Sequence, residues 1–84
     1  MSVLIKDIQK NTKEIIRVEI SEYMGKELIN LRIWFQAIDD NGNYVYKPSQ
    51  KGVALNISQY EELRDAIQRI GDYIQDRNAG NPQS

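Results

Sequence analysis

Apolar and polar residues alternate along most of the first two thirds of the chain, which is the period-two pattern of strands with one face buried. In segment 14–23 the apolar series is Ile16, Val18 and Ile20. Segment 27–36 carries two alternating series, one of Ile29, Leu31, Ile33 and Phe35 and one of Leu28, Asn30, Arg32 and Trp34. Segment 3–9 also reads as extended. We therefore expect at least three strands before residue 37.

Turn and breaker residues divide these segments. Met24-Gly25-Lys26 turns the chain, and Asn41-Gly42 favours a tight hairpin because both residues tolerate left-handed conformations. Residues 44–52 are expected to form an irregular edge or loop, since Pro48 cannot donate a ladder hydrogen bond. A last short strand is predicted over 52–57, and it points Val53, Leu55 and Ile57 inward.

The pattern then changes to a helical period, which predicts a helix over about 57–77. A capping box can start it, from Asn56 with Gln59, which we favour, or from Ser58 with Glu61. Its apolar stripe consists of Tyr60, Leu63, Ile67, Ile70 and Ile74. Ala66 and Tyr73 lie beside this stripe and widen it. The sheet can cover part of this stripe and a second helix the remainder.

Strands followed by one helix give an α+β domain with an antiparallel sheet. We expect a single domain over 1–77 and a disordered tail over 78–84, which has no apolar anchor. An 84-residue chain is close to the lower limit for an independent core, so association with a second copy is expected.

Composition narrows the chemistry. The chain has no cysteine and no histidine, which removes thiolate and imidazole metal sites and the commonest acid-base group. We therefore expect neither an enzyme nor a cofactor or metal site. The N-terminal segment lacks an apolar run long enough for a signal peptide or membrane span, so the expected location is intracellular: cytoplasm or nucleoid, or nucleus in a eukaryote, without membrane contact.

Charge is distributed unevenly. The net charge is −1, but residues 1–52 hold eight Lys and Arg against seven Asp and Glu, whereas residues 53–84 hold three against five. A basic surface therefore belongs to the strands. Alternation places Trp34 on the same face as Arg32, and an aromatic beside an arginine is typical of a surface that binds unpaired nucleic acid.

Two segments, EYMGKELINLRIWF at 22–35 and YKPSQKGVALNISQYEEL at 46–63, combine several features in a fixed order. An aromatic precedes Gly-Lys, a strand with an arginine ends in two aromatics, an acidic Gly turn follows, and Lys-Pro-x-x-Lys-Gly precedes a capped helix. In this order the chain resembles the transcriptional coactivator positive cofactor 4 family over about residues 14–74.

The resemblance implies a strongly curved four-stranded antiparallel sheet followed by one C-terminal helix (ββββα), dimerised through the helices, with β-ribbons that bind single-stranded DNA. The residues that match the nucleic-acid-binding positions are Tyr23, Lys26, Arg32, Trp34, Phe35, Lys47 and Lys51. The helix stripe Tyr60, Leu63, Ile67, Ile70 and Ile74 is the expected dimer interface.

Met24 and Gln50 stand where basic residues are common in the family, which lowers the expected affinity. Melted duplex and RNA remain alternative ligands, and transcription machinery is a further candidate partner. Trp34 is the first expectation for the stacking ring and Phe35, which alternation turns inward, the second. Arg32 can instead pair with Glu19 or Glu22. Tyr44 and Tyr46 can extend the stacking platform or pack over the sheet edge, and we favour packing.

A second hypothesis is a protein-interaction module that uses its sheet edge or helix face without binding nucleic acid. Net acidity favours this alternative, and the aromatic-arginine strand with Lys-Pro-x-x-Lys-Gly favours single-stranded DNA binding, with a role as a transcriptional coactivator or regulator.

Overall fold

The computed structural model describes residues 2–80 and the side chains of 2–77. The elements follow the order β1 (Val3–Gln9), β2 (Glu14–Tyr23), β3 (Lys26–Ile38), β4 (Tyr44–Asn56), a 3-10 turn η1 (Ile57–Gln59) and α1 (Tyr60–Gly80). The strands form one open antiparallel sheet in the order β1-β2-β3-β4. The predicted ββββα architecture is therefore confirmed. No helix in the described part is long and apolar enough to cross a membrane.

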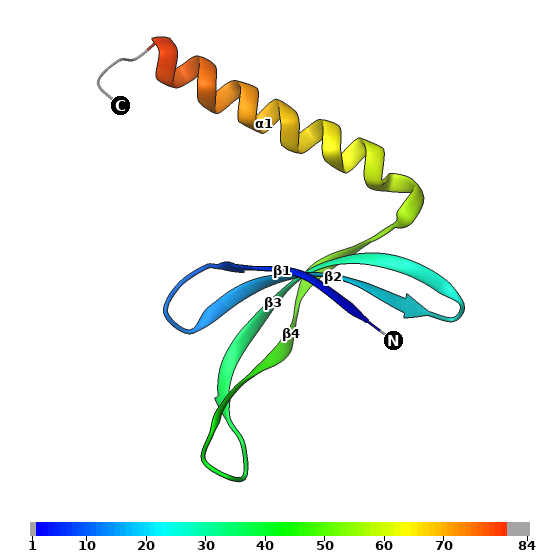
Figure 1. Ribbon diagram of the computed structural model, residues 1–84, viewed down its shortest axis with the longest axis vertical. Coiled ribbons are helices and arrows are strands. Elements are labelled where there is room, and N and C mark those ends of the chain that lie inside the picture. Colours follow the sequence, from blue (N-terminus) through cyan, green and yellow to red (C-terminus); the bar gives the residue numbers. More distant parts are fainter. Residues whose placement is uncertain (1, 81–84) are drawn as a thin grey trace.

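The sheet is strongly twisted, and its three hairpins point in different directions (Figure 1). β2 and β3 pair without interruption from Glu14 opposite Phe35 to Tyr23 opposite Lys26. The outer pairings are each interrupted once, between Leu4 and Lys6 in β1 and between Arg32 and Trp34 against β4. Interruptions of this kind bend and twist a strand locally, which accounts for the splayed hairpins.

The tight turn lies at Met24-Gly25, with φ of 52° and 81°, between the paired residues Tyr23 and Lys26. Positive φ at both positions gives the twist that joins two antiparallel strands. The turn predicted at Asn41-Gly42 joins β3 to β4: the backbone N–H of Gly42 donates to the Asp39 carbonyl at 3.0 Å, and the Asp39 N–H donates to the Asn43 carbonyl at 2.9 Å. Of the two turn residues only Gly42 has positive φ, 82°. The Asp39 carboxylate accepts the backbone N–H groups of Asn41 and Asn43, each at 2.9 Å.

Of the two alternatives for 44–52, an irregular edge or a loop, the structure has the irregular edge: β4 is a single strand from Tyr44 to Asn56 with one interruption in its pairing. β4 is an edge strand, so Pro48 costs no hydrogen bond on its outer side. Arg32 pairs with Gly52 and Trp34 with Pro48, so residues 49–51 bulge opposite Ile33 alone. A bulge allows this proline-containing segment to remain a strand.

Very few side chains are buried within one protomer. Ile15 is 3% exposed and Ile29 6%, and the buried amide of Asn30 donates to the Ser21 hydroxyl. The Cα radius of gyration is 16.5 Å, against about 12 Å for a compact chain of this length. Much of the apolar surface is therefore uncovered.

The helix begins as predicted at Asn56, whose backbone N–H donates to Oε1 of Gln59 at 2.9 Å. After η1 it extends away from the sheet (Figure 1). Ile67 and Ile70 remain 58% and 57% exposed, so the sheet does not cover these members of the stripe. The helix continues to Gly80, beyond the expected end at 77; residues 78–80 of the predicted disordered tail are helical, and 81–84 lie outside the described residues.

Candidate nucleic-acid interface

The two adjacent aromatics of β3 face opposite sides of the sheet. Trp34 lies opposite Ile15 on β2 and Pro48 on β4, whereas Phe35 lies opposite Glu14 and Lys47. Phe35 is 39% exposed. Trp34 is half-buried, and its Nε1 is buried without a hydrogen-bond partner in the described part of the chain. The more open ring is therefore Phe35.

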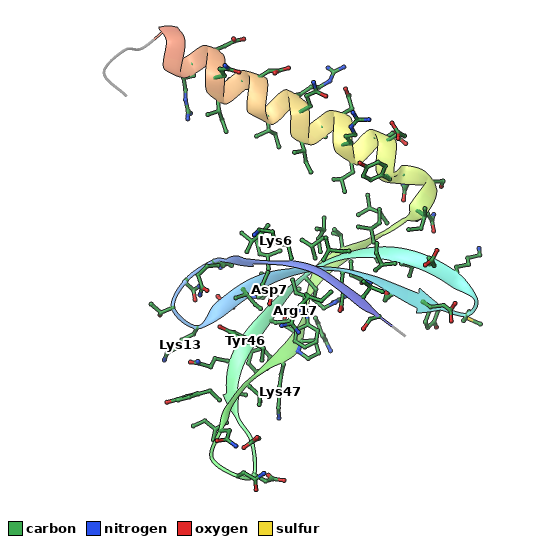
Figure 2. The ribbon with its side chains drawn as sticks, in the orientation of Figure 1. Lys6, Asp7, Lys13, Arg17, Tyr46 and Lys47 are labelled. Carbon is green, nitrogen blue, oxygen red and sulfur yellow. The ribbon has the colours of Figure 1, made fainter. Side chains whose placement is uncertain are left out.

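An arginine covers one face of the Trp34 ring. Cζ of Arg17 lies 4.3 Å from the ring centroid, within the range of a cation-π contact. Asp7 on β1 holds this arginine with two bonds, Nε to Oδ1 at 2.9 Å and Nη2 to Oδ2 at 3.1 Å. Asp7 and Arg17 lie where β1 crosses the sheet (Figure 2).

These contacts correct the expectation that the indole is freely open and that Phe35 points inward. Alternation correctly puts Trp34 on the face of Arg32, since Arg17 pairs with Arg32 and Ile15 with Trp34. That face, however, is covered locally by the Arg17 side chain. The Phe35 ring, on the opposite face, remains 39% exposed.

The hydrogen bonds from Arg17 are the largest influence on the pKa of the Asp7 carboxyl and lower it below the usual value. The same bonds raise the pKa of Arg17. Both groups therefore stay charged through the neutral range, and the pair fixes the guanidinium above the indole.

A row of three residues crosses the sheet at Phe35. In-register partners in an antiparallel sheet project from the same face, so Glu14 on β2 and Lys47 on β4 flank the ring on either side. Figure 2 places Lys47 on the strand that leads toward the β3–β4 loop. The row combines a carboxylate, an aromatic platform and an ammonium group.

Arg32 organises the bulge of β4. Its Nη1 donates to the Ser49 carbonyl at 3.1 Å, while the Ser49 hydroxyl donates to the Ile33 carbonyl at 2.8 Å and accepts the Lys51 backbone N–H at 3.0 Å. Within the described residues, Arg32 makes no ion pair with Glu19 or Glu22. Its charge is therefore not neutralised by a carboxylate.

Gly52 closes the bulge. A Cβ placed on it would lie 2.7 Å from the Leu31 carbonyl oxygen and 2.8 Å from Cα of Arg32. Both are backbone atoms that cannot move away independently, so a side chain here would push β4 off β3. The glycine of Lys-Pro-x-x-Lys-Gly is thus required by the close approach of two strands.

Lys51, in the bulge, is brought toward the Phe35 row. Its charge is one of the influences that lower the pKa of Glu14, although the largest is the hydrogen bond from Asn11, followed by that from Lys10. We call the group of Glu14, Phe35 and Lys47, together with the neighbouring Lys51 of the bulge, the Phe35 surface.

Tyr23 and Lys26 do not join this surface. They pair at the end of the β2–β3 hairpin, where both are exposed. Lys26 is six residues from Arg32, about 20 Å along the strand. The seven predicted residues therefore fall into three groups: the hairpin end, the Arg32 and Trp34 face, and the Phe35 surface.

Cations without ion pairs are concentrated in the sheet. Of the eight basic residues in the strands and the β1–β2 turn, Lys10 pairs with Glu14 and Arg17 with Asp7. The other six have no carboxylate partner within 4.0 Å among the described residues. Despite the net charge of −1, the sheet can therefore offer several free cations to a polyanion.

The predicted dimer residues lie along α1. Within one protomer Tyr60, Ile67, Ile70 and Ile74 are exposed and Leu63 is half-buried. The nearby Tyr73 is exposed too. Among the described residues, the sheet therefore leaves most of this stripe exposed.

Sequence reasoning missed Asp7, Arg17, Glu14 and Ser49. Asp7 and Arg17 belong to different strands, and only the β1–β2 register brings them together. Glu14 could have been noticed, because Asn11 three residues earlier is a typical side-chain cap of a turn. Within residues 2–77, no three acidic side chains gather in a way that could hold a metal ion.

Comparisons with known proteins agree with this geometry. The family model described as Transcriptional Coactivator p15 (PC4) matches residues 10–66. A PC4 homolog from Burkholderia pseudomallei superposes with a TM-score of 0.67 at 20% identity, covering 83% of this chain and 89% of that one.

A bacteriophage T5 homolog of the eukaryotic coactivator PC4, implicated in recombination-dependent DNA replication, superposes with a TM-score of 0.63 at 18% identity. The superposition covers 100% of this chain and 96% of the T5 chain. At these identities the two structures establish the shared fold, and the family model covers more than half of the sequence. The chain belongs to the Transcriptional Coactivator p15 (PC4) family.

Proposed function

We propose that this protein binds single-stranded DNA as a homodimer, stacking bases on an exposed aromatic ring and contacting phosphates through lysine and arginine. The observation that carries the proposal is the Phe35 surface, where an open ring lies beside Lys47 on a PC4-type sheet. Phe35 takes the stacking role first assigned to Trp34.

Stacking explains the preference for unpaired strands. Every base has a π-face, and base-aromatic stacking is worth about 1–3 kcal/mol per base without selecting a sequence. A duplex hides its base faces in the stack, so it cannot use Phe35. Trp34, locked beneath Arg17, serves as a support for the sheet rather than as the platform.

Phosphate contacts come from cations that are free of carboxylates. Lys47 and Lys51 flank the ring, and Arg32 holds the bulge that presents Lys51. Lys26, about 20 Å from Arg32 along β3, and its β2 partner Tyr23 extend the path toward the other hairpin. A strand that follows this path crosses the curved sheet.

Dimerisation through α1 supplies the burial that one protomer lacks. The exposed stripe of the helix includes Ile67, Ile70 and Ile74, and pairing with a second helix would remove it from water. Two copies would also present two Phe35 surfaces. A linked pair of sites raises the affinity for one long strand.

The cellular role we propose is regulation of transcription, with the transcription machinery as partner, in keeping with the coactivator family. The T5 homolog is implicated in DNA replication, and unpaired DNA occurs in both processes. We propose DNA as the ligand, with RNA as a competitor to be measured alongside it.

β1 favours the alternative of a protein-interaction module. It is an edge strand, and Val3, Leu4 and Ile5 are more than half exposed. Such an edge can accept a strand from a partner protein. A protein that used only this edge would not need free cations around Phe35.

A titration separates the two proposals. A labelled single strand of mixed sequence and a hairpin duplex of the same sequence are titrated with protein at low and high salt, with fluorescence anisotropy as the readout. We expect the single strand to bind more tightly than the duplex, with affinity falling as salt rises. The absence of single-strand binding at micromolar protein and low salt would overturn the nucleic-acid proposal.

A further inference from the structure

Glu14 lies directly opposite Phe35 on the neighbouring strand. Directly opposed residues of an antiparallel pair have Cβ atoms about 5 Å apart. A base stacked on the ring would therefore have Glu14 on its β2 side. The position is unexpected for a polyanion-binding surface, because a carboxylate repels phosphate.

The carboxylate is held in place through one of its two oxygens. Oε1 accepts Nδ2 of Asn11 at 2.7 Å and Nζ of Lys10 at 3.3 Å. Asn11 is itself fixed, since its Oδ1 accepts the backbone N–H groups of Lys13 and Glu14, each at 2.9 Å. Oε2 accepts no hydrogen bond from residues 2–77.

The charges around Glu14 resolve the conflict with phosphate. Lys10 pairs with the carboxylate at 3.3 Å, and the bonds from Asn11 and Lys10 keep its pKa below the usual value, so it remains an acceptor at neutral pH. Lys47 lies on the far side of Phe35, two strand spacings or about 10 Å from Glu14.

This order gives a nucleotide a direction on the sheet. Its phosphate fits beside Lys47, its base on Phe35 and the outer edge of the base toward Glu14. The free Oε2 can accept a hydrogen bond but cannot donate one. A base edge that offers an amino group suits it, and an edge that offers a carbonyl oxygen is repelled.

We propose that Glu14 selects the base on Phe35, favouring bases with an exocyclic amino group over thymine and uracil. This inference rests on the proposed single-strand binding and adds a base preference to it. Cytosine and thymine make the sharpest comparison, because both are single rings. Cytosine presents its N4 amino group, which carboxylates accept, where thymine presents O4.

The test compares labelled oligo-dC and oligo-dT by anisotropy at mildly alkaline pH, where cytosines do not pair with each other through protonation. We expect wild-type protein to bind oligo-dC about 2- to 10-fold more tightly, the effect of one hydrogen bond. Glu14→Gln should lose most of this ratio, because its amide can either donate or accept. Glu62→Gln, the same substitution on the exposed helix, should keep it.

A chemical probe gives the answer without any variant. Replacing cytosine by 2-pyrimidinone removes only the amino group, and we expect the wild-type affinity to fall toward that for oligo-dT. Equal binding of oligo-dC and oligo-dT by wild type, or an equal gain for both strands in Glu14→Gln, would overturn the base preference. Failure to bind any single strand would instead overturn the proposed function.

Discussion

The guanidinium of Arg17 lies 4.3 Å above the ring of Trp34, and Asp7 holds it there from the edge strand β1. The only tryptophan of the chain is therefore part of the sheet's internal support. The adjacent Phe35 faces the opposite, open side. Trp34 therefore supports the sheet, and Phe35 is the ring proposed to contact the ligand.

Asp7→Asn should release Arg17 from the indole and change the emission of Trp34. Because the pKa of Asp7 is lowered in the folded state, its contribution to the free energy of unfolding is complete above about pH 4 and is lost as the pH falls through the lowered value. We expect a loss of about 1 kcal/mol at neutral pH in urea unfolding.

The matched control is Asp65→Asn, which removes an ion pair with Arg69 on the exposed helix. It should cost less than the Asp7 substitution and leave Trp34 emission unchanged. Equal losses of unfolding free energy in the two variants, with identical Trp34 emission, would contradict the role of Asp7 in holding Arg17 over Trp34.

Gly52→Ala should destabilise the sheet by about 1–3 kcal/mol, because the new Cβ meets the backbone of Leu31 and Arg32. Thermal or urea unfolding measures the loss. Gly71→Ala is the control, since nothing lies within 4 Å of a Cβ there and alanine favours a helix. If Gly52→Ala is as stable as wild type, the close approach of β3 and β4 is not as described.

Features that depend on near neighbours in the sequence could be predicted, whereas features that depend on tertiary contacts could not. Segments 3–9, 14–23 and 27–36 and the Asn56 cap were predictable because alternation and capping act between near neighbours. The continuity of β4 was not, since its bulge depends on Ser49 bonding to Ile33, sixteen residues away.

The same distinction applies to the candidate site. Alternation correctly separated Trp34 from Phe35, but it could not tell which face would be covered. Cover on one face comes from Arg17, which Asp7 holds from ten residues away. This contact is not encoded within the strand that carries the aromatics.

Ile70→Asp should give monomers or unfolded protein, because it would bury an unpaired charge in the proposed helix seam. Light scattering at several protein concentrations, with circular dichroism to check folding, measures the outcome. Gln68→Asp adds the same charge outside the stripe and should remain a dimer. A stable, folded Ile70→Asp dimer would place the interface elsewhere.

The salt dependence of binding counts the phosphate contacts. Each contact with a single strand contributes about −0.7 to the slope of log affinity against log salt, so Lys47 and Lys51 on the Phe35 surface together give about −1.4 per site. Lys47→Ala should reduce the slope by about 0.7. Arg64→Ala, on the exposed helix, should not change it, and a Lys47→Ala slope equal to wild type would remove Lys47 from the path.

The most direct test is single-strand binding by Phe35→Ala, measured by anisotropy against wild type and Tyr44→Ala, an exposed aromatic next to the β3–β4 loop. We expect Phe35→Ala to lose about 1–3 kcal/mol of binding free energy, the value of one stacked base. Tyr44→Ala should bind like wild type. Full affinity in a folded Phe35→Ala protein would contradict the central claim that bases stack on this ring.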